Sequence, residues 1–315
     1  MNRTHFVSNE PALALIDVAT TTGVALCALL LVGASRVAVA LVGAAIVTVM
    51  ISGVARCRKT ASSPEKLGPY TLGEKIGQGG MGEVYRARHA MMDRDVAIKI
   101  LPHDHADEEA RLRFEREARL TSRLESPNTV AVHDYGRTPD GRFYYVMELV
   151  DGYDLEALVR TFGPQPASRV VHVLKQVCDA LDEAHSAGLV HRDIKPANIA
   201  LCERARVKDV VKVLDFGLVT ELDKLGSSEE RSRLVGTPAY LAPEAIVSPD
   251  AIDSRVDIYA VGAVAYWLLT GTPVFDGGSI VEICSHHLHT TPERPGARLG
   301  RAIPSELEEV VLRCL

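Results

Sequence analysis

The stretch "HRDIKPAN", from His191 to Asn198, places five polar or charged side chains within eight residues, between the apolar segments "AGLV" and "IAL". A solvated loop would have such a composition. A site that directs a carboxylate, an ammonium group and an amide toward one point would have it as well. The segments on either side of the stretch distinguish these two interpretations.

The neighbouring segments have clear secondary-structure patterns. Before the stretch, residues 166–188 ("PASRVVHVLKQVCDALDEAHSAG") have an amphipathic helical pattern that ends at a glycine. After it, residues 210–218 ("VVKVLDFGL") form a β-type run that contains the tripeptide "DFG". Further on, residues 236–244 ("GTPAYLAPE") precede "SRVDIYAVGAVAYWLLTG", whose apolar composition predicts a buried helix.

A glycine-rich turn lies much earlier in the chain. Gly77, Gly79 and Gly82 form a G-x-G-x-x-G pattern between the β-type segments "YTLGEKI" and "EVYRARHA". The dinucleotide-binding fingerprint has the same spacing, but there the turn leads into a helix. Here the chain returns into a strand, which excludes that class of enzyme. A glycine hairpin of this kind can lay backbone N–H groups over phosphates, although a plain hairpin has the same pattern.

The next strand, "VAIK", ends at Lys99, and an amphipathic helical pattern follows over residues 107–126. A lysine in this position is informative only if an anionic group lies opposite it. Glu117 is the acid that we place against Lys99, with Glu115 as the second choice. Residues 141–152 ("GRFYYVMELVDG") then predict a strand followed by a polar turn.

Taken in order, IGQGGMGEV, VAIK, HRDIKPAN, DFG and APE resemble the protein kinase family, and specifically the serine/threonine kinases of bacterial type. The resemblance covers the chain from about Tyr70 to its C-terminus. It implies an α+β, bilobal protein-kinase fold over residues 70–315, with a β-rich N-lobe and a mostly helical C-lobe. It also implies transfer of the ATP γ-phosphate, with Mg²⁺, to serine or threonine hydroxyls of protein substrates.

The resemblance assigns a nucleotide site to residues of this chain. Lys99 is implied to hold the α- and β-phosphates, with Glu117 as its ion-pair partner. Asp215 and Asn198 are implied to be the magnesium ligands, and both offer the hard oxygen atoms that magnesium prefers. The glycine-rich turn would cover the phosphates. The adenine pocket would be formed by Ile76, Val84, Ala97, the gatekeeper Met147, and backbone groups of Glu148 and Val150.

The catalytic and regulatory roles follow in the same way. Asp193 is implied to be the catalytic base, and Lys195 would contact the transferred phosphate. Arg192 implies an activation segment that is organised by phosphorylation, because an arginine binds phosphate bidentately. Thr237 is expected in the substrate-facing loop, and Asp257 is expected to tie down the catalytic loop. The candidate autophosphorylation sites are Ser227, Ser228 and Ser232.

One departure from the family pattern concerns the end of the C-lobe. The family usually continues with a further helix, whose arginine pairs with the glutamate of APE. This chain stops at Leu315, so Glu244 has no evident partner and the C-lobe is expected to be truncated. A nucleotide-binding pseudokinase that acts as a scaffold is the alternative function. The presence of Lys99, Asp193 and the two candidate metal ligands favours the enzyme.

Residues 1–59 have a different character and predict a membrane anchor. Residues 18–35 and 37–54 carry no charge and are separated only by Arg36. Eighteen residues give about 27 Å of helix, close to the ~30 Å hydrocarbon core of a bilayer. A two-helix hairpin is the preferred interpretation, and a single span is the alternative. The cluster "RCRK" then marks the cytoplasmic flank, and residues 60–69 form a linker.

Composition sets the remaining expectations. The formal net charge of −6 gives no reason to expect a nucleic-acid partner. The six cysteines are scattered without a CxxC pair, which fits a reducing compartment. We therefore expect a membrane-bound protein whose kinase domain faces the cytoplasm, with protein substrates. Homodimerisation for trans-autophosphorylation, the substrate and the activating signal are not decided by the sequence.

Overall fold

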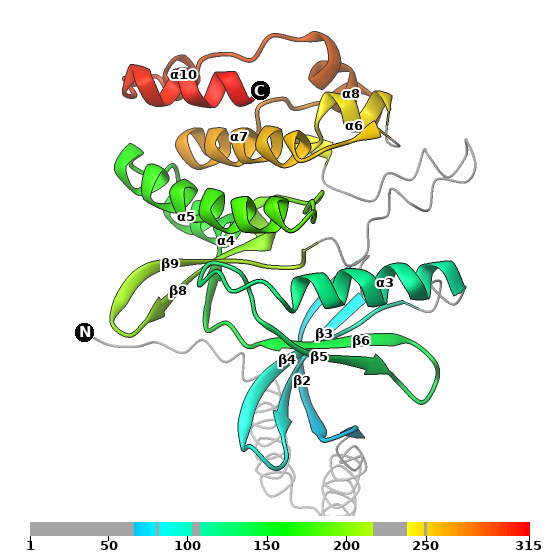
Figure 1. Ribbon diagram of the computed structural model, residues 1–315. Helices are drawn as coiled ribbons and strands as arrows, with labels where there is room; N and C mark the ends of the chain where they lie inside the picture. Colours follow the sequence, from blue (N-terminus) through cyan, green and yellow to red (C-terminus); the bar gives the residue numbers. More distant parts are fainter. Residues whose placement is uncertain (1–65, 80–81, 103–107, 217–237, 249–250) are drawn as a thin grey trace, which may run out of the picture. The chain divides into compact units, whose positions relative to one another are not determined.

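The computed structural model describes residues 66–79, 82–102, 108–216, 238–248 and 251–315 (Figure 1). The expected membrane anchor, most of the linker, the tip of the glycine-rich turn and the candidate autophosphorylation sites lie outside these residues. Within the described part, no helix is both long and apolar enough to span a bilayer. The residues from Lys66 onward form one compact unit.

The strands fall into two sheets, one of six strands and one of three. Those of the larger sheet are β1 (Lys66–Leu67), β2 (Tyr70–Gly79), β3 (Gly82–His89), β4 (Arg94–Ile100), β5 (Val132–Arg137) and β6 (Phe143–Glu148). Those of the smaller sheet are β7 (Gly152–Asp154), β8 (Ile199–Arg204) and β9 (Val207–Val213). The short strand β1 lies within the segment that the sequence suggests is a linker.

The helices, apart from one, follow the larger sheet in the chain (Figure 1). That one is α3 (Glu108–Thr121), which lies between β4 and β5. The others are α4 (Leu155–Phe162), α5 (Ala167–Ser186), α6 (Pro243–Val247), α7 (Arg255–Thr270), α8 (Ile280–His289), α9 (Pro295–Leu299) and α10 (Ser305–Cys314). Two 3₁₀ turns are η1 (Pro196–Asn198) and η4 (Pro238–Tyr240).

The larger sheet is antiparallel, with the strand order β1-β2-β3-β4-β6-β5. An apolar cluster packs on each of its two faces, and alternate side chains of β4 belong to one cluster or the other. Val96, Ile98 and Ile100 pack into one apolar cluster, whereas Ala97 packs into the cluster on the other face. Lys99 shares the face of Ala97 by the same alternation, and a slip of one residue in register would move its ammonium group to the wrong side of the sheet.

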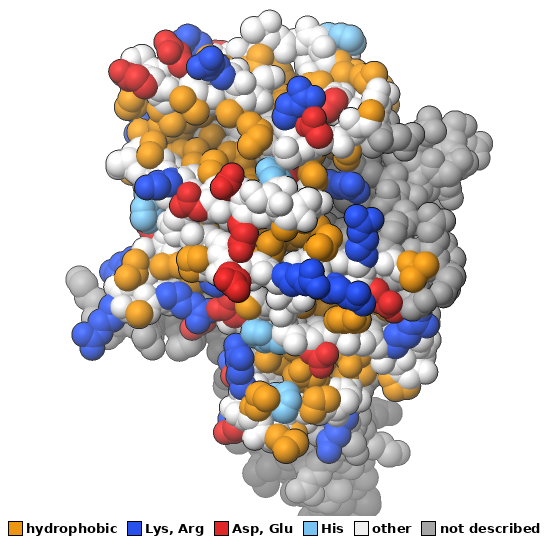
Figure 2. All heavy atoms as spheres, in the orientation of Figure 1, with side chains coloured by type: hydrophobic (Ala, Val, Ile, Leu, Met, Phe, Trp, Pro, Cys, Tyr) orange, Lys and Arg blue, Asp and Glu red, His pale blue; other side chains and the backbone are white. Residues whose placement is uncertain are grey.

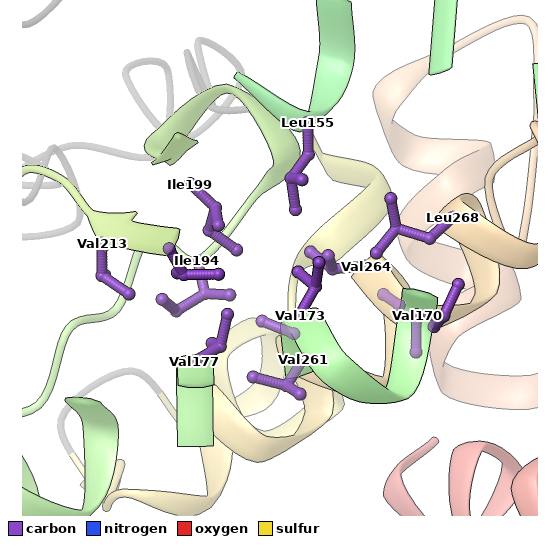
Figure 3. Close-up of a cluster of buried hydrophobic side chains, with 14 of the residues drawn as sticks. Leu155, Val170, Val173, Val177, Ile194, Ile199, Val213, Val261, Val264 and Leu268 are labelled. Carbon is purple, nitrogen blue, oxygen red and sulfur yellow. The ribbon is translucent and has the colours of Figure 1, made fainter. Parts of the chain in front are cut away.

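The helical lobe is built around α5 and α7. Nearly every residue of α7 is buried, which confirms the sequence prediction of an apolar core helix. Figure 3 shows that Val170, Val173 and Val177 of α5 lie against side chains of α7 and of strands β8 and β9. On the other side of α7, Gly262 allows α10 to approach closely, because a Cβ atom at this position would lie 2.6 Å from Cβ of Cys314.

The three-stranded sheet lies where the two lobes meet. It has the order β7-β8-β9. The "HRDIKPAN" stretch follows α5 and leads directly into β8, and β9 then leads to Asp215. The segment that leads into β5 bonds to the end of β9: Val130 N donates to Val213 O at 3.0 Å, and Val213 N donates to Asn128 O at 2.7 Å. These bonds fix the end of β9, and therefore Asp215, relative to the larger sheet.

The helix expected over residues 107–126 is shorter in the structure, where α3 ends at Thr121. The difference has a physical cause in a distant residue. The side chain of Glu183, on α5, accepts hydrogen bonds from the backbone N–H groups of Glu125 at 2.7 Å and Ser126 at 2.8 Å. The segment after α3 is therefore held by α5 in a non-helical conformation.

The surface shown in Figure 2 carries acidic and basic side chains that are interspersed. Hydrophobic side chains gather between α10 and α5 on this face, over α7. The charged residues include exposed ion pairs such as Arg160–Glu156 and Arg255–Asp253, which contribute little to stability because water screens exposed charges. The stability of this unit therefore depends on its apolar clusters and buried hydrogen bonds.

Candidate active site

Asp215 joins the two lobes through its carboxylate. It follows β9 in a left-handed backbone conformation, with φ of 55°. Lys99 Nζ, from β4, lies 2.8 Å from Oδ2 of Asp215. The hydroxyl of Tyr145, from β6, donates to Oδ1. Both carboxylate oxygens therefore have a donor from the sheet of the other lobe.

The electrostatics of Asp215 follow from these contacts. Burial acts to raise the pKa of this carboxyl, but the charge of Lys99 and the hydrogen bonds from Lys99 and Tyr145 outweigh it, so that the pKa lies below its ordinary value. Lys99 is itself only 6% exposed. The buried lysine and the half-buried carboxylate pair with each other and so avoid most of the cost of an unpaired charge.

The second carboxylate of the site belongs to Asp193, in the stretch His191–Asn198. Lys195 Nζ lies 2.8 Å from Oδ2 of Asp193. Asn198 Nδ2 donates to the same oxygen at 2.7 Å and to the backbone oxygen of Asp193 at 2.8 Å. The carboxylate, the ammonium group and the amide of this stretch thus converge, as one of the two interpretations of the sequence requires.

Asp257, which is 0% exposed near the start of α7, holds the beginning of this stretch. Its Oδ2 accepts from the backbone N–H of His191 at 2.8 Å, and its Oδ1 accepts from that of Arg192 at 2.7 Å. His185 Nε2 lies 2.8 Å from Oδ2 as well. Arg192 has a φ of 65°, a strained conformation for a non-glycine residue, so these bonds stabilise an otherwise unfavourable turn.

His191 connects the stretch to the Asp215 segment. Its Nε2 donates to the backbone oxygen of Leu214 at 2.8 Å, and its ring lies 4.8 Å from the ring of Phe216. Leu214 N in turn donates to the backbone oxygen of Asn198 at 2.8 Å. The two candidate carboxylates, Asp193 and Asp215, are therefore positioned by one continuous set of hydrogen bonds.

The residues expected around adenine lie mainly on one face of the larger sheet. Ala97 and Met147 are buried in one cluster and are cross-strand partners, and Val84 packs against that cluster. Ile76, by contrast, is 48% exposed on β2. Val150 is half-buried and packs against the same cluster.

Glu148 has a structural contact that its expected role does not include. Its backbone N–H donates to Ala131 O at 2.9 Å. Its side chain forms ion pairs with Lys212, at 2.9 Å, and with Arg204. Burial lowers the pKa of Lys212, and the nearby charge of Arg204 lowers it further. The segment after β6 is thus tied to β8 and β9 by this side chain.

The glycine-rich turn is a β-hairpin, as the sequence predicts. Gly77 lies opposite Val84, and Gly79 lies opposite Gly82. Gly82 has a φ of 119°, and a Cβ atom there would lie 2.2 Å from the backbone oxygen of Ile100. Glycine is therefore required at this position by both backbone conformation and space.

Several expected residues are not brought into the site by the described structure. Lys99 pairs with Asp215, whereas the side chain of Glu117 lies outside the described part; Glu115 is half-buried on α3. Among the described residues, none forms an ion pair with Glu244. Outside the described residues lie Ser227, Ser228, Ser232 and Thr237.

The comparisons with known proteins agree with this geometry. The sequence matches the family described as "Protein kinase domain" over residues 70–315. The chain belongs to the protein kinase family. The solved kinase domain of Mycobacterium tuberculosis PknI, a double mutant, is 30% identical, with a TM-score of 0.64 over 81% of this chain and 90% of that one. Rad53 in complex with AMP-PNP is 25% identical, with a TM-score of 0.63 over 77% of this chain and 60% of that one.

Two curated relatives of the chain are bacterial serine/threonine protein kinases. Serine/threonine-protein kinase pkn3 of Myxococcus xanthus is 40% identical over 78% of this chain and 46% of its own length. Serine/threonine-protein kinase PknB of Mycobacterium tuberculosis is 41% identical over 78% of this chain and 39% of its own length. The chain spans less than half of the length of these relatives.

The family acts with ATP and magnesium, and the residues of this site fit a magnesium ion. Asp215 offers a carboxylate whose pKa is lowered, so it is ionised at neutral pH. The amide nitrogen of Asn198 donates to the carboxylate of Asp193, so the amide oxygen of Asn198 is the atom suited to bind a metal. An aspartate and an amide oxygen are ligands of the hard type that magnesium prefers.

The geometry of Asp257 leads to a prediction about stability. Replacing it, Asp257→Ala, leaves two backbone N–H groups without their acceptor, and we expect the free energy of unfolding to fall by about 3 kcal/mol or more. Urea denaturation measures this loss. Asp182→Ala is the matched control, because this carboxylate is exposed on α5, where its removal should cost far less than at Asp257. Equal losses for the two variants would contradict the role of Asp257.

Proposed function

We propose that the protein is an active serine/threonine kinase that transfers the γ-phosphate of ATP to serine or threonine hydroxyls of proteins. The observation that carries the proposal is the connected set of Lys99, Asp193, Asn198 and Asp215. Together these four groups meet the demands of phosphoryl transfer, which needs positioned phosphates, neutralised charge and an oriented nucleophile. A scaffold that does not catalyse would have no need for all four.

The proposed division of roles follows the contacts. Lys99, on the buried face of β4, would hold the α- and β-phosphates of ATP. Asp215 and Asn198 would hold magnesium, which supplies positive charge to the phosphate oxygens. Asp193 would accept the proton of the substrate hydroxyl and orient that hydroxyl for attack. Lys195, at 2.8 Å from Asp193, is close enough to stabilise the charge of the transferred phosphate beside it.

We also propose that phosphorylation of the activation segment raises the activity. Arg192 supports this proposal, because its side chain is exposed while its backbone N–H is fixed by Asp257. An exposed guanidinium beside the catalytic carboxylate can bind a phosphoserine in two hydrogen bonds. The candidate phosphoserines are Ser227, Ser228 and Ser232, and a second copy of the kinase would transfer the γ-phosphate of ATP to them.

Asp193→Asn tests the proposed catalytic role. The amide keeps the shape and can still contact Lys195 and Asn198 through its oxygen, but it is too weak a base to accept a proton. We expect the rate of phosphate transfer to fall by at least a hundredfold, in the range of about 10² to 10⁴ typical of a general base. The affinity for ATP, measured by equilibrium titration, should change by less than about threefold, because no proposed phosphate contact is lost.

The control for this experiment is Asp182→Asn, an exposed position on α5. It makes the same chemical change at the surface and should leave the rate of transfer unaffected. A rate for Asp193→Asn close to that of the unmodified chain would show that Asp193 is not the base.

The location of the protein is a separate proposal, which residues 1–59 support through their two uncharged stretches and the following "RCRK" cluster. These residues would anchor the kinase at the cytoplasmic face of the membrane. Deletion of residues 1–60 should move the chain from the alkali-resistant membrane fraction to the soluble fraction. A truncated chain that remains in the membrane fraction would contradict the anchor.

A further inference from the structure

Two adjacent tyrosines on β6 have different surroundings. Tyr144 packs into the apolar cluster with Tyr70 and Leu72, on one face of the larger sheet. Tyr145 lies on the other face, is 1% exposed, and directs its hydroxyl to Oδ1 of Asp215. The sequence pattern did not single out either residue. Only Tyr145 reaches the candidate metal-binding carboxylate.

The contact between Tyr145 and Asp215 has a defined direction. The phenol carries an O–H donor, and an ionised carboxylate offers acceptors only, so Tyr145 donates and Asp215 accepts. A hydrogen bond to an ionised acceptor in a buried site is stronger than one between neutral groups.

The sheet register explains why two donors meet at one carboxylate. Lys99 and Tyr145 are direct cross-strand partners on β4 and β6. Cross-strand partners point to the same face with their Cβ atoms about 5 Å apart. Lys99 contacts Oδ2 at 2.8 Å and Tyr145 contacts Oδ1, so the pair holds both ends of the carboxylate.

The two donors cannot keep equal roles when a nucleotide binds. Under the proposed function Lys99 serves the phosphates of ATP, and its contact with Asp215 is then shared or lost. The hydroxyl of Tyr145 has no phosphate to bind and remains on Oδ1. An oxygen of a carboxylate has more than one acceptor position, so this hydrogen bond leaves Asp215 able to act as a ligand.

We propose that Tyr145 is a positioning residue, which holds the magnesium-binding carboxylate of Asp215 in place while Lys99 turns to the nucleotide. This inference rests on the proposed function, because it takes Asp215 to be the metal ligand. It predicts that the tyrosine hydroxyl contributes to the magnesium dependence of nucleotide binding and contributes little to nucleotide binding without the metal.

Tyr145→Phe is the variant that tests the inference, and Tyr144→Phe is its matched control. The two variants remove the same hydroxyl from neighbouring buried residues on opposite faces of β6. The 315-residue chain is titrated with a non-hydrolysable ATP analogue at a series of magnesium concentrations, and in EDTA. Thermal unfolding without ligand shows that each variant is folded.

In Tyr145→Phe, the magnesium concentration for half-maximal enhancement of binding should rise about tenfold, the loss typical of one hydrogen bond to a charged group. Binding in EDTA should stay within about twofold, since the proposed phosphate contacts of Lys99 are kept. Tyr144→Phe should match the unmodified chain in both conditions. An unchanged or lowered magnesium requirement in Tyr145→Phe would overturn the inference, and the lowered one would show that the hydroxyl competes with the metal.

A second measurement avoids dependence on the folding of the variant. 3-Fluorotyrosine, incorporated at position 145 alone, reports the state of this hydroxyl by its ¹⁹F resonance. The resonance should move when magnesium is added to the nucleotide complex, and the same label at position 144 should not move. A resonance at position 145 whose chemical shift does not change when magnesium is added would overturn the inference. Absence of any magnesium-dependent binding in the unmodified chain would instead overturn the proposed function, and the inference with it.

Discussion

The contact between Asp215 and the pair Lys99–Tyr145 is the interaction on which the rest of the site depends. It is the point at which the end of β9 meets the larger sheet, and it places a carboxylate, an ammonium group and a phenol within hydrogen-bond reach. Without the alternation along β4 and β6, neither donor would face Asp215. The fold therefore serves to bring a side chain of one lobe to two side chains of the other.

A second constraint holds the opposite end of the site. Asp257 belongs to the buried helix α7. Its carboxylate accepts the backbone N–H groups of His191 and Arg192, and so stabilises the strained turn at Arg192. His191 links this turn to the Asp215 segment, because its ring hydrogen-bonds to the backbone oxygen of Leu214 and packs against the ring of Phe216. The apolar cluster of α5 and α7 is thus connected to the candidate catalytic groups by buried hydrogen bonds, which are directional as well as stabilising.

The sequence predicted much of this arrangement, because each motif combines a local backbone pattern with a residue type that phosphoryl transfer needs. The β-hairpin at the glycines, the helix before "HRDIKPAN" and the buried apolar helix are confirmed by the structure. Tyr145 was missed because "FYYVME" is buried on both faces, and periodicity within such a run does not show which face reaches the site. The early end of α3 was missed because Glu183, the residue that causes it, is 58 positions distant from Glu125. The roles given to Glu117 and to the serines of the activation segment remain predictions, as does the membrane anchor.

If these residues form a working phosphotransferase, the chain should label itself. The full chain is incubated with γ-labelled ATP and magnesium, beside Asp215→Asn as the blank, and the labelled amino acids are identified after hydrolysis. We predict label on serine or threonine in the unmodified chain and none in the variant. Absence of label in a folded chain that binds ATP, or equal label in the two proteins, would show that these residues do not form an active kinase.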